Sequence, residues 1–227
     1  MKKTIFWGIL ALVILATQGV AAQNLKPEPS SPAHIAMTFY KLTRQIPDFD
    51  AWVRASQIYN TAADVDKPAT LHRERQELNN RFSLLTLQEP LVVETPVTLS
   101  AYNAAAQGFF VENFKDDTFF PAHHLDHGYA IVPQGIIDRQ FLKVEDPALA
   151  STIEAARDRA LTMVLLLSPK YADNTAPASL DGKNHWLISA GIEKMTLYIS
   201  DLPVPLWQSQ VPGAADVKFQ ELLNLRQ

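Results

Sequence analysis

The chain has 227 residues, 24 of them acidic and 20 basic, with a formal net charge of −4 and no cysteine. The lack of cysteine excludes disulfides, thiolate metal sites, thiol nucleophiles and dithiol redox motifs. The acidic balance makes nucleic acid and anionic membrane surfaces poor partners, and we expect neither.

Residues 1–22 have the three parts of a secretory signal peptide. A positive start is followed by an apolar run over residues 5–16, and Val20–Ala22 ends in the small residues that a signal peptidase accepts. We expect cleavage after Ala22 and a mature protein in the bacterial periplasm or the medium, without a stable membrane anchor. The alternative is an uncleaved anchor, but the apolar run is shorter than the roughly 20 residues that span a bilayer.

Residues 23–32 are polar and contain three prolines, a composition typical of a linker. A single domain is predicted over residues 33–201. It begins with an amphipathic helix, because Ser31 can act as its N-cap and Pro32 suits the first helical position. The apolar residues of this helix recur at helical spacing and end before Pro47: Ile35, Phe39, Leu42 and Ile46.

Two more helices are predicted before the first strand. Asp48 can cap a second helix, which presents Phe49, Trp52, Val53 and Tyr59 on one side. The third starts near Pro68 and runs toward Gln88. Its apolar stripe predicts a face turned to the core: Leu71, Leu78, Phe82 and Leu85.

At Leu91 the apolar period changes from about 3.6 to 2, which predicts a strand over residues 91–100. Pro96 lacks an amide hydrogen and therefore favours the edge of a sheet. Residues 109–111 are predicted to pair with this strand in antiparallel fashion, and residues 129–132 supply a third strand.

The C-terminal half contains one helix between strands. Asp146 and Pro147 repeat the cap-then-proline signal and predict a helix of about three turns. Residues 161–167 are almost entirely apolar and predict a strand buried on both faces, at the centre of the sheet. Residues 172–184 are rich in turn formers, and residues 186–199 predict either one strand, bent at Gly191, or two strands joined by a turn.

Residues 202–227 are predicted to form an extended segment and a short helical tail at 214–225. Helices first and strands later, with one inserted helix, indicate an α+β fold. We therefore expect N-terminal helices packed on an antiparallel or mixed sheet.

Three phrases of the sequence, Phe39–Leu42, Pro47–Trp52 and Leu180–Lys183, resemble an uncharacterised family of exported bacterial proteins. These phrases are turn signals and aromatic anchors. The resemblance implies export and a domain of unknown function, and it supplies no activity.

The densest group of potential ligands is His123, His124, Asp126 and His127. Imidazole and carboxylate groups can bind zinc, copper or nickel. In an extended segment His123 and His127 would share one face and the other two residues the opposite face, and a helical turn would also align His123 with His127. A polar loop without metal is the favoured interpretation, and His34, His72 and His185 are interpreted as surface or capping residues.

No standard hydrolase, acyl-enzyme or phosphate-loop motif is present in the sequence. We therefore predict no catalytic residue, no cofactor and no metal ligand. The favoured hypothesis is a non-enzymatic binding or interaction domain for an envelope protein or a small apolar ligand, with Trp207 as the best candidate for an exposed contact. The alternative is a metal-binding or metal-dependent hydrolytic protein that uses His123 and His127.

Overall fold

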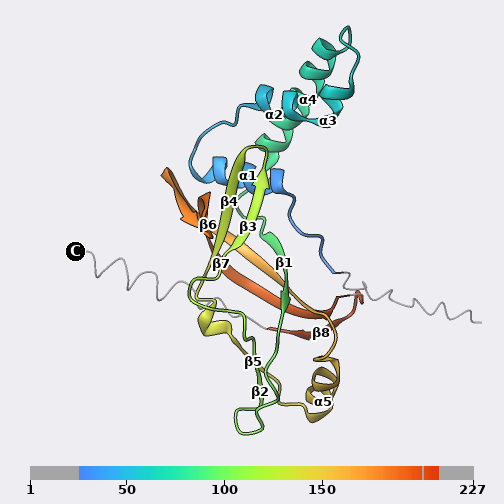
Figure 1. Cartoon of the computed structure of the whole chain (residues 1–227), viewed down its shortest axis with the longest axis vertical. Helices are drawn as coiled ribbons and strands as arrows, with labels where there is room; N and C mark the ends of the chain where they lie inside the picture. Colours follow the sequence, from blue (N-terminus) through green and yellow to red (C-terminus); the bar gives the residue numbers. More distant parts are fainter. Residues whose placement is uncertain (1–25, 201, 210–227) are drawn as a thin grey trace, which may run out of the picture.

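The computed structural model describes residues 26–200 and 202–209, and Figure 1 shows how their helices and strands are arranged. The helices are α1 (Pro32–Leu42), α2 (Phe49–Ala55), α3 (Gln57–Thr61), α4 (Lys67–Leu84), the short 3-10 helix η1 (Ile137–Arg139) and α5 (Pro147–Ala156). The strands are β1 (Leu91–Val97), β2 (Gly108–Phe110), β3 (Phe120–His124), β4 (His127–Gln134), β5 (Phe141–Lys143), β6 (Leu161–Leu180), β7 (Lys183–Ile199) and β8 (Pro205–Gln208). This order confirms the predicted α+β fold, with helices first and α5 inserted among the strands.

Side-chain caps start the first helices where the sequence predicts them. The Ser31 hydroxyl accepts a hydrogen bond from the His34 amide at 3.2 Å, and the Asp48 carboxylate accepts one from the Ala51 amide at 3.0 Å. The predicted second helix is wrong in one respect, because the extended backbone of Ser56 ends α2 and its hydroxyl then caps α3.

The third predicted helix forms as α4, and three residues of its apolar stripe, Leu78, Phe82 and Leu85, pack against the margin of the hydrophobic core. Figure 1 shows α2, α3 and α4 beyond one end of the sheet. The α4 stripe packs there against neighbouring helices, with the Phe82 ring 5.7 Å from the Phe49 ring. All four residues of the stripe are only half-buried: Leu71, Leu78, Phe82 and Leu85.

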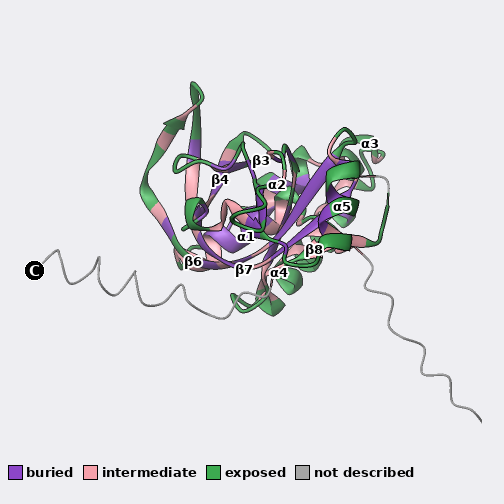
Figure 2. Cartoon of the chain, turned by 90° about the horizontal axis from the view of Figure 1, so that it is seen from below, coloured by how far each residue is buried: buried purple, intermediate pink, exposed green. Residues whose placement is uncertain are grey.

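The main sheet is mixed and has six strands. Its strand order is β1-β6-β7-β4-β3, and β8 also pairs with β7. The pair of β4 with β7 is parallel, and the other neighbours are antiparallel. Figure 2 shows that buried residues concentrate in these strands and in the helix packed on them.

The helix α1 covers one face of the sheet through aromatic contacts. The ring of Phe39 lies 5.5 Å from that of Tyr129 on β4 and 5.6 Å from that of Trp186 on β7. The register pairs Tyr129 with Trp186, so both side chains point to the same side of the sheet. The main core therefore lies between α1 and this face.

The edge position predicted for the first strand is confirmed, but its predicted antiparallel pairing with residues 109–111 is confirmed only at one bridge. β1 lies at the end of the strand order, with Pro96 near its C-terminal end. Residues 108–110 instead pair with β5 in a separate two-stranded sheet, and only an isolated bridge joins Leu99 to Val111. Strand length and apolar pattern do not identify a partner, which depends on the path of the intervening chain.

The buried strand at residues 161–167 is confirmed, although β7 rather than β6 occupies the middle of the strand order. The segment predicted as turn-rich, 172–184, is mostly strand. β6 continues through it with one register shift, between Asp173 and Ala178, and only Asp181 and Gly182 form the turn, with φ of 49° and 73°. These are the positive angles that suit a tight hairpin of right-handed twist. β7 is one strand, with an irregularity near Glu193.

The structure describes only part of the predicted N-terminal and C-terminal segments. Within the predicted linker, the Ser30 amide donates to the Val92 carbonyl at 2.9 Å, so this part is attached to β1. Within the predicted C-terminal coil, residues 205–208 form β8. The predicted signal peptide, residues 1–22, and the predicted helical tail, residues 214–225, lie outside the described residues.

No helix in the described part of the chain is both long enough and apolar enough to cross a membrane.

Candidate functional site

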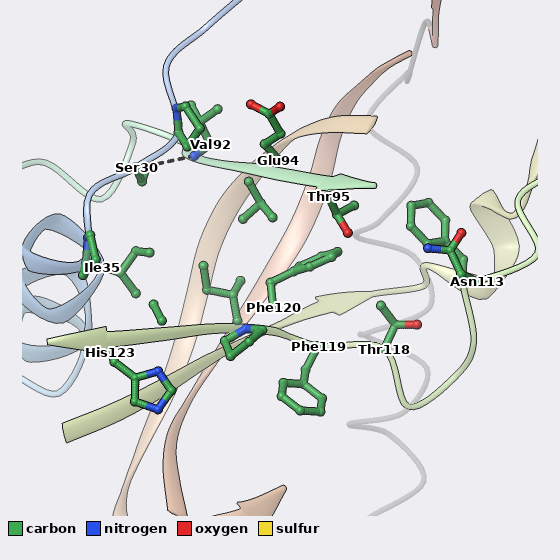
Figure 3. Close-up of a pocket in the computed structure, with 17 residues that line it drawn as sticks. Ser30, Ile35, Val92, Glu94, Thr95, Asn113, Thr118, Phe119, Phe120 and His123 are labelled. Carbon is green, nitrogen blue, oxygen red and sulfur yellow. Dashed lines mark hydrogen bonds between the residues drawn. The ribbon is translucent and has the colours of Figure 1, made fainter. Parts of the chain in front are cut away.

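The two ends of the strand order, β1 and β3, border a single groove of about 550 Å³ (Figure 3). The sheet therefore curves until its outer strands face each other. The N-terminal segment and α1 close one end of the groove, and the loop before β3 closes the other.

The groove has an apolar interior and a polar rim. Its buried apolar side chains come from α1, three strands and the loop after β2: Ile35, Val93, Phe114, Phe120 and Ile131. The rim is polar and comes from the same elements and the N-terminal segment: Ser30, Glu94, Thr95, Asn113 and Thr118. Such a combination suits a ligand with apolar groups and a few hydrogen-bonding groups.

The outer edge of β1 is covered at both ends by the protein itself. At the start, Val92 donates to the Ser30 hydroxyl and accepts from the Ser30 amide, both at 2.9 Å. At the end, the Asn113 amide group donates to the Pro96 carbonyl at 2.9 Å and accepts from the Thr98 amide at 3.2 Å. These contacts show that Val92 and Pro96 turn their backbone groups away from β6.

Glu94 lies between these two covered positions. In an antiparallel ladder, alternate residues turn their backbone groups to opposite sides, so the N–H and C=O of Glu94 also point outward. On this outer side of β1, neither the N–H nor the C=O of Glu94 has a hydrogen-bonding partner among residues 26–200 and 202–209. The Glu94 side chain forms an ion pair with Lys26, which holds it at the rim. The edge thus presents the unpaired N–H and C=O of one residue, Glu94, to the groove.

The opposite edge belongs to a tight hairpin. Leu125 and Asp126 form a two-residue turn between β3 and β4, with a φ of 53° at Leu125. β3 contains Pro121, which is exposed and has no N–H to donate. Proline in both edge strands, at positions 96 and 121, limits uncontrolled pairing with other chains.

The hairpin also explains where the candidate metal ligands lie. The register pairs His124 with His127, so these two side chains share one face, while His123 lies on the other. The prediction that His123 and His127 share a face is wrong, because the two-residue turn reverses the chain between them. The described residues contain no group of three or more histidine, cysteine, aspartate or glutamate side chains that could hold a metal ion.

His124 packs against an aromatic ring. Its imidazole lies 4.2 Å from the Trp52 ring, measured between centroids. Burial in this contact lowers the pKa of His124, and the nearby His127 lowers it further. The neutral imidazole is therefore favoured, and His124 has a packing role in the contact between the hairpin and α2.

His185 is the residue that sequence reasoning placed wrongly. Its side chain is buried, and its Nδ1 lies 3.1 Å from the Lys183 carbonyl oxygen. Its Nε2 has no hydrogen-bonding partner among the described residues. A buried polar atom without a partner costs about 1–3 kcal/mol, so such atoms call for an explanation. His185 is isolated in the sequence and no local signal distinguishes it.

Trp207, the best candidate for an exposed contact, is exposed only in part. Its indole is half-buried, and Nε1 donates to the Lys143 carbonyl at 3.0 Å. The residue attaches β8 to β5, so its hydrogen-bonding group is already used within the protein.

Comparison of the chain with protein-family models, with curated proteins and with solved structures finds no match. The chemistry of the groove and of the histidines is therefore the basis for a function.

Proposed function

We propose that this protein is an exported, non-enzymatic binding protein and that its groove receives a short extended segment of an envelope protein. The observation that carries the proposal is the outward N–H and C=O of Glu94, a residue that lines the groove between two covered positions of the same edge. An extended polypeptide can supply both the donor and the acceptor that this group requires.

The groove matches the way in which proteins bind extended peptides at a sheet edge. In that mode, backbone hydrogen bonds provide affinity and side-chain pockets provide selectivity. Ser30 already pairs with Val92 by backbone and side-chain bonds, so this edge accepts a neighbouring chain. Beside it, Phe120 and Ile131 offer apolar contacts to the alternate side chains of a bound segment.

Export is supported by the signal-peptide pattern of residues 1–22. A cysteine-free chain folds independently of the redox state of the envelope. The partner would therefore be an envelope protein with an exposed extended segment.

A pair of substitutions at one position tests the backbone contact. Glu94→Pro removes the outward N–H, whereas Glu94→Ala removes only the side chain. Proline should be tolerated because Pro96 occupies the equivalent outward position two residues later. The probe is a library of random heptapeptides displayed on phage and selected against residues 23–227, followed by affinity measurement with synthetic peptides.

We expect selected peptides to bind the wild type and Glu94→Ala with similar affinity. Loss of a buried hydrogen bond should weaken binding to Glu94→Pro by at least about tenfold. Thermal unfolding of each variant establishes that it is folded. Equal binding to the proline variant, or the absence of any enriched peptide, would refute the proposal. Displacement of a groove-bound hydrophobic dye by fatty acids but not by peptides would instead favour a small apolar ligand.

A further inference from the structure

We propose that His123 and His185 together bind a divalent late transition-metal ion, most tightly Cu²⁺. The site lies on the face of β3, β4 and β7 opposite to the α1 core. His123 also lines the groove, but the proposed ion does not require a bound peptide. Neutral imidazole is a preferred ligand of such ions, and Cu²⁺ leads the affinity order of the first-row divalent metals.

Three neighbouring strands bring the two imidazoles together. The register pairs His123 on β3 with Gly128 on β4. His185 lies on β7, on the other side of β4. A Cβ atom added to Gly128 would lie 3.0 Å from Cδ2 of the His185 ring. Because Gly128 has no side chain, the imidazoles of His123 and His185 can approach each other above it.

The distance between the rings suits a shared ion. Two imidazoles that bind one ion through nitrogen at about 2.0–2.1 Å, with about 110–120° between the bonds, have centroids roughly 5–5.5 Å apart. The centroids of His123 and His185 are 5.5 Å apart. The spacing of the two ring centroids therefore matches that of joint coordination, and the rings meet edge to face with an interplanar angle of 73°.

His185 is also oriented as a metal ligand. Histidine ligands usually donate their second ring N–H to a carbonyl or carboxylate, which fixes the tautomer. Nδ1 of His185 lies 3.1 Å from the Lys183 carbonyl, which favours a proton on Nδ1 and a lone pair on Nε2. That Nε2 is one of three buried side-chain atoms without a partner among the described residues, with His124 Nε2 and Arg157 Nε, and its side chain is only 2% exposed.

The surroundings indicate an open site rather than a closed structural one. The Phe119 ring lies 5.9 Å from the His185 ring and covers it, whereas His123 is exposed and gives access to the ion. The part of the chain that the structure describes offers no third histidine or carboxylate for such a group. Water or an added ligand would fill the remaining positions of the ion.

The test is a titration of purified residues 23–227 with CuCl₂ in a weakly coordinating buffer. The test variant is His123→Ala, and His127→Ala is the matched control, since both side chains are exposed on the same hairpin. We expect His123→Ala to bind Cu²⁺ at least about tenfold more weakly than the wild type, and the control to bind as the wild type does. Circular dichroism checks that both variants are folded.

A spectroscopic measurement identifies the ligands directly. Pulsed electron paramagnetic resonance of the Cu²⁺-loaded protein should count two bound imidazoles in the wild type and one in His123→Ala. Unchanged affinity of His123→Ala, a single imidazole in the wild type, or an equal loss in both variants would overturn the proposal. The Glu94→Pro variant should keep Cu²⁺ binding, so the two proposals fail separately.

Discussion

Truncation of Phe39 should destabilise the protein more than almost any other change in α1. This side chain is 3% exposed and has three aromatic neighbours, at centroid distances of 5.5 Å to Tyr129, 5.6 Å to Trp186 and 5.7 Å to Tyr40. Phe39→Ala removes the buried ring and leaves a cavity between the helix and the sheet, at a cost of about 3–5 kcal/mol. For a domain of this size, that loss corresponds to a Tm lower by about 6–20 °C.

Phe39→Leu separates packing volume from aromatic contact. It restores most of the apolar volume but not the ring contacts, and its cost should be below about 1.5 kcal/mol. Ile46→Ala is the control, since Ile46 is 78% exposed and its truncation should change the free energy of unfolding by less than about 0.5 kcal/mol. Urea unfolding followed by tryptophan fluorescence measures all three. If Phe39→Ala cost no more than the control, the packing of α1 on the sheet would be refuted.

Three further predictions concern pH, a helix cap and a turn. Because contact with Trp52 holds the pKa of His124 below 6.5, the unfolded chain takes up this proton first as the pH falls. The free energy of unfolding should therefore fall as the pH drops below about 6.5, and urea melts in a chelating buffer should show a smaller fall in His124→Gln. Asp146→Ala removes the cap that accepts from the Ala148 amide at 2.9 Å, and calorimetry should show a loss of about 0.5–2 kcal/mol. Gly182→Ala places a side chain at a φ of 73° in open space, so backbone strain alone should cost about 1–2 kcal/mol, and an unchanged melt would contradict this.

The sequence predicts features whose causes lie within a few neighbouring residues. Ser31, Asp48 and Asp146 were recognisable as caps because each satisfies a backbone donor two or three positions later. Pro96 indicated an edge strand because it lacks an N–H wherever it lies. Residues 161–167 indicated a doubly buried strand because polar side chains are nearly absent.

Predictions that required the partner of a strand were less successful. The pairing of β2 with β5 joins segments about thirty residues apart, and no apolar pattern distinguishes it from a pairing with β1. Residues 172–184 are rich in turn formers, but pairing with β7 extends the strand through most of them. Local propensity is weak in strands, and neighbouring strands decide such cases.

The candidate site likewise has some features that the sequence predicts and others that depend on strand pairing. The signal-peptide pattern that predicts export, the absence of cysteine and the histidine-rich segment are properties of the sequence itself. The groove exists because β1 and β3, the two ends of the strand order, curve toward each other. Likewise, His123 and His185 are 62 residues apart in the chain, but their strands lie on either side of β4. Their rings approach each other there because Gly128, which lies between them on β4, has no side chain. Local hydrogen bonds and apolar periods determine helices and strands, whereas long-range strand pairing decides which side chains meet, and only the tertiary structure contains that information.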